Sequence, residues 1–144
     1  MLVSQILKSK SDDAVVTLPP DTALAQVVEV LSSRRIGAVV ISQDGKTVLG
    51  ILSERDVVRE LGRRGAGCLS DRCDTAMTTR VVTCARHDKA DDVLAQMTEG
   101  RFRHLPVVEA GEMVGLISIG DVVKARLAEL SMEKDALEGM IKGF

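Results

Sequence analysis

The stretch GILSERDVV at residues 50–58 returns as GLISIGDVV at residues 115–123. In both, an apolar run typical of a buried strand is followed by Ser and, three residues later, by Asp at the start of an expected helix. We refer to them as the first joint and the second joint. The sequence therefore predicts one strand-to-helix connection that is built twice.

The similarity extends upstream of the joints, because residues 15–41 match residues 81–108. Each segment opens with β-branched residues, continues with apolar residues at the spacing of one helical face, and ends in a nearly all-apolar run. Asp21 and Asp88 are the expected N-caps of the two helices. A Gly-containing turn then leads into each joint. Each copy predicts strand, helix, strand, turn, strand, helix, so the chain is an internally duplicated α+β protein.

The 144 residues are too few for two independent halves, so the copies are expected to share a core. We predict a first unit at residues 1–68 with a short N-terminal helix, and a second unit at residues 69–144 with a longer C-terminal helix. Residues 62–74 are rich in Gly, Asp and Cys and have little periodicity, so they are the expected linker. A short helical turn is expected near residues 75–77.

The composition and the absence of known motifs exclude several classes of function. The formal net charge is −2, and no apolar window approaches the roughly 18 residues of a membrane span, so we expect a soluble, cytoplasmic protein without a membrane partner. The aromatic residues are two Phe, too few for the stacking platforms of single-stranded nucleic acid sites. The sequence contains no P-loop, GxGxxG or HExxH motif and no arrangement of nucleophile and base. We therefore expect no catalytic residues and no enzyme.

The Ser and Asp of the joints allow two interpretations. Ser followed three residues later by an acidic residue is a capping-box arrangement, which needs no ligand. Alternatively, a short carboxylate at a helix N-terminus stays ionised and can accept hydrogen bonds from the two hydroxyls of a ribose. The sequence leaves both open for Asp56 and Asp121.

Donors for a phosphate are present in the second copy only. Arg101, Arg103 and His104 lie just before a buried strand, so their side chains would converge on a cleft between the copies. The first copy has Gly37 and Ala38 at the positions of Arg103 and His104. The two halves are therefore expected to differ where a phosphate would lie.

Two other kinds of site are compatible with the residues present. Cys68, Cys73, Cys84 and His87 could bind zinc, but their spacing is looser than that of compact zinc sites. A nucleic-acid site could use the arginine pairs at residues 34–35 and 63–64. We keep both as alternatives and assign no metal ligand.

The last helix is expected to continue from Asp121 to the end of the chain. Apolar residues there alternate in steps of four and three, with Lys134 filling one position: Val123, Leu127, Leu130, Leu137, Ile141 and Phe144. This heptad seam predicts either a tail that packs back on its own domain or a pair of helices in a dimer.

Taken together, the tandem copies, the two S-x-x-D joints and the RHLPVV strand at residues 103–108 resemble the cystathionine β-synthase (CBS) domain pair, or Bateman module. The resemblance implies two βαββα units packed through their sheets. It also implies two clefts for adenine-containing ligands such as AMP, ADP, ATP, S-adenosylmethionine or NAD(H), and pairing into a homodimer.

The resemblance also implies roles for individual residues. Ser53 with Asp56 and Ser118 with Asp121 match ribose-binding positions. Thr83 is expected to face the first pair and Thr17 the second, while Ile36 and Phe102 border the adenine. Arg103 and His104 match phosphate contacts, Arg55 is a further candidate, and Gly37 and Ala38 mark the departure in the first copy. We predict a regulatory adenine-nucleotide sensor of energy or redox state that acts on an unidentified protein.

Overall fold

The computed structural model describes residues 1–10 and 15–143. Within these, no helix has the length and apolar character needed to cross a membrane. The elements, in chain order, are α1 Val3–Ser9, β1 Thr17–Leu18, α2 Leu24–Arg34, β2 Ala38–Ile41, β3 Gly50–Ser53, α3 Glu54–Arg64, the 3-10 helices η1 Ala66–Ser70 and η2 Cys73–Thr75, α4 Ala90–Gly100, β4 His104–Glu109, β5 Glu112–Ser118 and α5 Ile119–Ile141. This order confirms the α+β class and the duplicated units.

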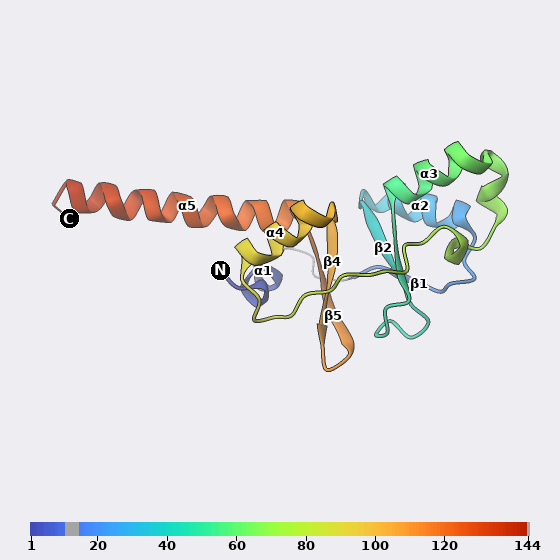
Figure 1. Ribbon diagram of the computed structural model, residues 1–144, viewed down its shortest axis with the longest axis horizontal. Coiled ribbons are helices and arrows are strands. Elements are labelled where there is room, and N and C mark those ends of the chain that lie inside the picture. The colour runs from blue at the N-terminus through green and yellow to red at the C-terminus, as the bar shows by residue number, and fades with distance from the viewer. Residues whose placement is uncertain (11–14, 144) are drawn as a thin grey trace.

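The two sheets are built alike but are unequal in size. β1 pairs in parallel with β2, which pairs antiparallel with β3. β4 and β5 form the matching antiparallel pair. The strand expected to open the second copy is reduced to a single parallel bridge, between Cys84 and Val107. The halves lie side by side in Figure 1, with β2 and β4 near each other.

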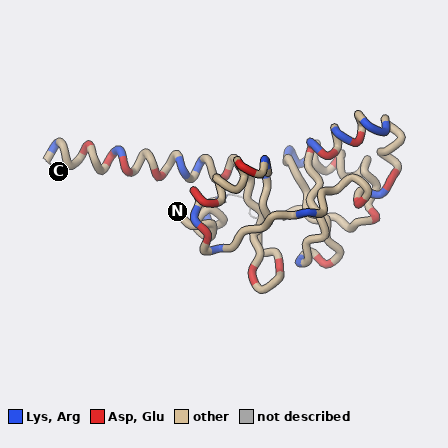
Figure 2. The backbone as a smooth tube through the Cα atoms, viewed as in Figure 1, with Lys and Arg blue, Asp and Glu red and all other residues tan. Residues whose placement is uncertain are grey.

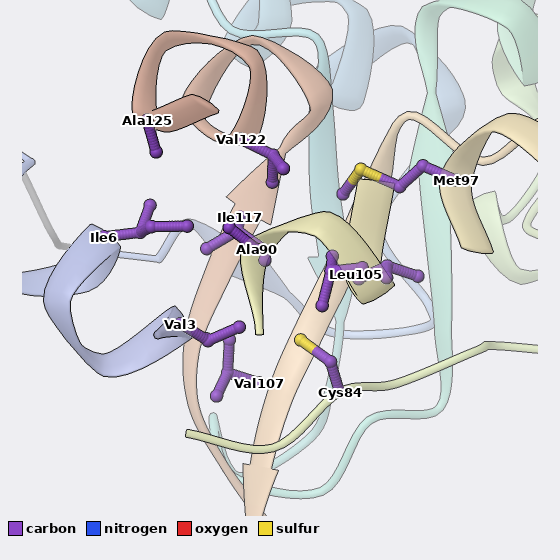
Figure 3. Close-up of a cluster of buried hydrophobic side chains, with 11 residues drawn as sticks. Val3, Ile6, Cys84, Ala90, Met97, Leu105, Val107, Ile117, Val122 and Ala125 are labelled. Atoms are coloured by element: carbon purple, nitrogen blue, oxygen red, sulfur yellow. The ribbon is translucent and has the colours of Figure 1, made fainter. Parts of the chain in front are cut away.

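The helix α1 packs on the second copy, although the sequence placed it in the first unit. Val3 and Ile6 are fully buried in a core with Val107, Ile117 and Ala125. Figure 3 shows both side chains pointing from α1 into this cluster. An apolar face on a short helix does not encode which of two similar cores it will cover. The tertiary structure alone makes that choice.

The expected linker plays the corresponding role for the first copy. It is not irregular, because η1 lies in it and η2 begins in it. Its Cys68 and Cys73, and Ala76 just beyond it, are buried in the first core together with residues of α2, β2 and β3. The predicted helical turn near residues 75–77 begins slightly earlier, as η2. Each copy is therefore covered by the chain segment that precedes the other copy.

Backbone hydrogen bonds also join each copy to the segment that covers it. They show that the predicted N-caps are wrong. The helices α2 and α4 begin after Ala23 and Lys89, so Asp21 and Asp88 are not their caps. Their first amides, which lack partners within a helix, donate to carbonyls of the covering segments instead. Leu24 N–H donates to Asp71 O and Ala90 N–H donates to Met1 O, each at 2.9 Å.

Each joint begins with glycine because the covering segment lies directly on the strand. A Cβ at Gly50 would lie 2.5 Å from Met77 Sδ and 2.9 Å from the Thr78 carbonyl oxygen. At Gly115 it would lie 2.8 Å from Leu7 Cδ2. The repeated glycine thus follows from packing in both copies.

Candidate functional site

Both joints form complete capping boxes. At the first, Ser53 Oγ accepts from the Asp56 amide at 3.4 Å, and Asp56 Oδ2 accepts from the Ser53 amide at 2.9 Å. At the second, the corresponding bonds between Ser118 and Asp121 measure 3.1 and 2.9 Å. The capping interpretation is therefore confirmed at both joints. Binding of a ribose would have to be an additional role of the same carboxylates.

The carboxylate of Asp56 is buried and already has further donors. Its Oδ1 accepts from Arg59 at 2.8 Å and from Thr78 Oγ1 at 3.1 Å, and its Oδ2 also accepts from Ser53 Oγ at 3.1 Å. Thr78, from the segment that connects the copies, is thus the threonine that contacts the first joint, whereas Thr83 is exposed. A carboxylate offers about four acceptor positions, so these donors occupy its capacity.

The carboxylate of Asp121 has a different partner. Lys10 Nζ lies 3.0 Å from Asp121 Oδ2 and also donates to the Leu116 carbonyl at 2.9 Å. Burial opposes ionisation, but the hydrogen bonds from the Ser118 amide and Lys10 together hold the pKa of Asp121 below its ordinary value. Asp121 lines a cavity of about 370 Å³ between α1 and α5, bordered also by Lys10 and Lys124.

A second cavity, of about 350 Å³, is formed jointly by the two copies and contains the first joint. This volume is in the range of small-ligand sites. The structure brings together eight of the residues predicted from sequence: Gly37, Ser53, Arg55 and Asp56 from the first copy, and Arg101, Phe102, Arg103 and His104 from the second. We call this the inter-repeat cavity.

Arginines dominate the walls of the inter-repeat cavity: Arg55, Arg59, Arg80, Arg101 and Arg103, against Glu54 and Asp56. Within the described part of the chain, only Arg59 of these five is in an ion pair. Figure 2 shows basic residues spaced along α3 and another on the segment that crosses from one half to the other. The cavity therefore offers several guanidinium groups to an anion.

His104 and Gly37 lie against each other across the interface between the copies. A Cβ on Gly37 would be 3.3 Å from His104 Cε1, so the small residue of the first copy leaves room for the imidazole of the second. Burial lowers the pKa of His104, against the opposing charge of Asp121 and with smaller contributions from Lys10 and Arg103. A pKa below 6.5 favours the neutral form of this imidazole at pH 7.

The remaining sequence-predicted residues do not line either cavity described above. Thr17 is in β1 and pairs with Val40, and Ala38 is buried in β2 opposite Ser53. Ile36 packs on the first core, Thr83 is exposed, and Ser118 serves as the cap of α5.

Eight lining residues were missed from the sequence: the polar Glu54, Arg59, Thr78 and Arg80, and also Ile51, Val81, Val82 and Gly100. Arg59 follows Asp56 by three residues on one helix, a spacing at which ion pairs form, so this contact could have been foreseen. Thr78 and Arg80 lie in a segment without periodicity. Nothing in the local sequence indicated where that segment runs.

The four residues considered for zinc are not brought together. Cys68 and Cys73 are buried in the first core and Cys84 in the second, while His87 is exposed. Burial raises the pKa of the Cys84 thiol to about 12, which disfavours the thiolate that a metal requires. Among the described residues, no group of three potential ligands is close enough to hold a metal.

Comparison with known proteins decides the family. The model of the CBS domain matches residues 3–63 and again 73–128. The chain belongs to the CBS-domain family. The CBS domain-containing protein CBSX3, mitochondrial, of Arabidopsis thaliana is 30% identical over 98% of this chain and 72% of its own length.

Solved structures of CBS-domain proteins share the fold. The crystal structure of the CBS-domain containing protein ATU1752 from Agrobacterium tumefaciens has a TM-score of 0.83 and 43% identity, over 88% of this chain and 99% of that chain. The CBS domain protein PAE2072 from Pyrobaculum aerophilum, complexed with AMP, has a TM-score of 0.77 and 26% identity, over 92% of this chain and 99% of that chain. PAE2072 is thus a CBS-domain protein of the same fold that binds AMP.

Proposed function

We propose that this CBS-domain pair is a regulatory module that binds an adenine nucleotide, such as AMP, ADP, ATP or NAD(H), in the inter-repeat cavity. The observation that carries the proposal is the meeting of the first joint with Arg103 and His104 of the other copy in one cavity. The AMP complex of a protein 26% identical in sequence supports this ligand class. The module has no catalytic role in this proposal.

The phosphate end of the nucleotide is assigned to the arginines. Arg55, Arg80, Arg101 and Arg103 come from both copies and have no ion pair within the described residues. Guanidinium groups bind phosphate oxygens through charge-assisted, often bidentate hydrogen bonds. Neutral His104 adds a hydrogen bond without adding charge. The apolar side chains of Ile51, Val82 and Phe102 line the same cavity and are assigned to the adenine.

The ribose is assigned to Asp56, and its binding has a structural consequence. Because the carboxylate already accepts from Arg59 and Thr78, ribose hydroxyls must replace at least one of these donors. Thr78 also exchanges two backbone hydrogen bonds with Ile51, of 2.8 and 3.0 Å, and so ties the connecting segment to β3. Release of the Thr78 hydroxyl would loosen this tie.

This exchange is the proposed switch. A ligand shifts a conformational equilibrium only through different affinity for the two states, and here the bound state would favour a connecting segment freed from Asp56. The module would transmit energy or redox state to an unidentified regulated protein and would act as a homodimer. Hydrogen exchange with and without nucleotide should differ at residues 76–82. Identical exchange there would contradict the switch.

The decisive experiment is isothermal titration calorimetry of the whole chain with adenosine, AMP, ATP and NAD+. We expect Asp56→Asn to weaken binding of all four at least about tenfold, and Arg103→Gln to weaken AMP and ATP but not adenosine. Arg103 is exposed, so its variant should fold normally. Asp121→Asn, the same change at the second joint, is the matched control and should leave this binding unchanged. No heat of binding with any of the four would overturn the proposal.

A further inference from the structure

The distal part of α5 extends away from the body of the molecule. Figure 1 shows the helix projecting beyond α1 and α4 toward the C-terminal end. From Leu130 to Gly143 every residue is exposed except Gly139, which is half-buried. The alternative in which this tail packs back on its own domain is therefore wrong for residues 130–143. Isolated helices of this length are marginal in water, so a partner is needed to hold it.

The apolar residues of the heptad seam are exposed. Their exposed fractions are 40% for Val123, 62% for Leu127, 48% for Leu130, 60% for Leu137 and 85% for Ile141; Phe144 lies outside the described residues. Val122 and Ala125, which anchor the helix on the body, are buried at other heptad positions, on the opposite side. The seam can therefore meet another helix while α5 keeps its place in the second core.

We propose that two copies of this chain pair through their α5 helices in antiparallel orientation. One register places every seam residue from Val123 to Ile141, Lys134 included, opposite a seam residue of the other copy. Val123 then faces the partner's Ile141, Leu127 faces the partner's Leu137, and Leu130 faces the partner's Lys134. The register is unchanged when a two-fold axis exchanges the two chains, as a closed dimer requires.

The charges beside the seam favour this orientation over the parallel one. In a parallel pair, Lys134 would face the partner's Lys134 within the seam, and Glu133 would lie beside the partner's Glu138. In the antiparallel pair, Lys134 packs its methylene stem on the partner's Leu130 and Lys124 lies beside the partner's Glu138. Glu133 is then the one charged residue that lies beside the same residue of the partner chain. Flanking charges of opposite sign set the orientation of paired helices.

The arrangement has a consequence for the assembly. A helix of 23 residues is about 35 Å long, so antiparallel pairing places the two bodies at opposite ends of the helix pair. The inter-repeat cavities of the two copies would then be remote from each other. With only about three heptads in contact, the dimer should dissociate on dilution.

Sedimentation equilibrium on variants of the whole chain tests both the surface and the orientation. Leu127→Glu alone and Leu137→Lys alone should each weaken self-association at least about tenfold, because each disrupts two layers of the antiparallel seam. Mixed together, the two variants should form a heterodimer. The carboxylate introduced at position 127 of one chain then faces the ammonium introduced at position 137 of the other, and the second layer remains Leu on Leu.

The matched control for both variants is Met132→Glu. Met132 is also apolar and 69% exposed, but it lies on the other side of the helix from the seam. We expect this variant to self-associate like the wild-type chain, because its new charge stays in solvent in the antiparallel pair.

Three results would overturn the proposal. A wild-type chain that stays monomeric at high micromolar concentration would exclude the pairing. Dimers that persist in both single variants would place the interface elsewhere. Single variants that are monomeric and fail to associate when mixed would exclude the antiparallel orientation, because a parallel pair puts residue 127 against residue 127.

Discussion

The first and second joints share their backbone but not their surroundings. Both have the same capping box and the same leading glycine under a covering segment. Asp56 accepts from Arg59 and Thr78 in a cavity between the copies, whereas Asp121 pairs with Lys10 in a cavity between α1 and α5. The difference shows that both copies keep what folding needs at the joint, while the residues around the carboxylate differ.

The largest expected effect tests whether α1 covers the second copy rather than the first. Ile6→Ala should destabilise the chain by about 2–5 kcal/mol, because a fully buried side chain of the second core is truncated. Urea denaturation would measure the loss. Hydrogen exchange should accelerate first in β4 and β5, which Ile6 helps to cover.

The control on the same helix is Lys8→Ala, since Lys8 is exposed and should be replaceable at little cost. If Ile6→Ala accelerated exchange in β2 and β3 first, then α1 would belong with the first copy after all.

A smaller effect should separate the two joint glycines. Gly50→Ala should destabilise by about 1–3 kcal/mol, because its methyl group meets the Thr78 backbone as well as Met77. Gly115→Ala meets only the flexible end of Leu7, so we expect the smaller loss. Thermal unfolding of both variants compares the two losses of stability. Equal losses would mean that the two covering segments shift equally easily to accommodate a methyl group.

The smallest expected effect concerns Asp121 and pH. Its folded-state pKa lies below the ordinary value, so its contribution to stability is complete above that ordinary value and is lost as the pH falls through the folded pKa. Asp121→Asn should therefore destabilise by about 1 kcal/mol at pH 7 and have no effect at the acid end of the transition.

Urea denaturation from pH 7 down to about pH 3 would measure this difference. Exposed Asp135→Asn is the control and should show no such dependence. If the free energies of unfolding of wild type and Asp121→Asn differed by the same amount at every pH, the charge of Asp121 would be ruled out as the cause of the difference.

Much of this protein could be predicted from local pattern. The duplication, the strand-to-helix joints and the continuous last helix follow from apolar spacing, which acts over a few residues. The sequence also predicted that Arg103 and His104 would converge on a cleft between the copies, and both line the inter-repeat cavity. The N-caps were not predicted correctly, because Asp21 and Asp88 resemble caps locally while the free amides of α2 and α4 are satisfied by distant carbonyls.

The sequence by itself determined the elements, their order and the chemical types of residue at the joints, because these depend on periodicity and on side chains a few positions apart. The tertiary structure alone decided that α1 covers the second copy, that Thr78 and Arg80 reach the inter-repeat cavity, and that Asp121 is paired with Lys10. These contacts join residues far apart in the chain. Two similar copies offer similar local signals, so only packing of the whole molecule distinguishes one partner from the other.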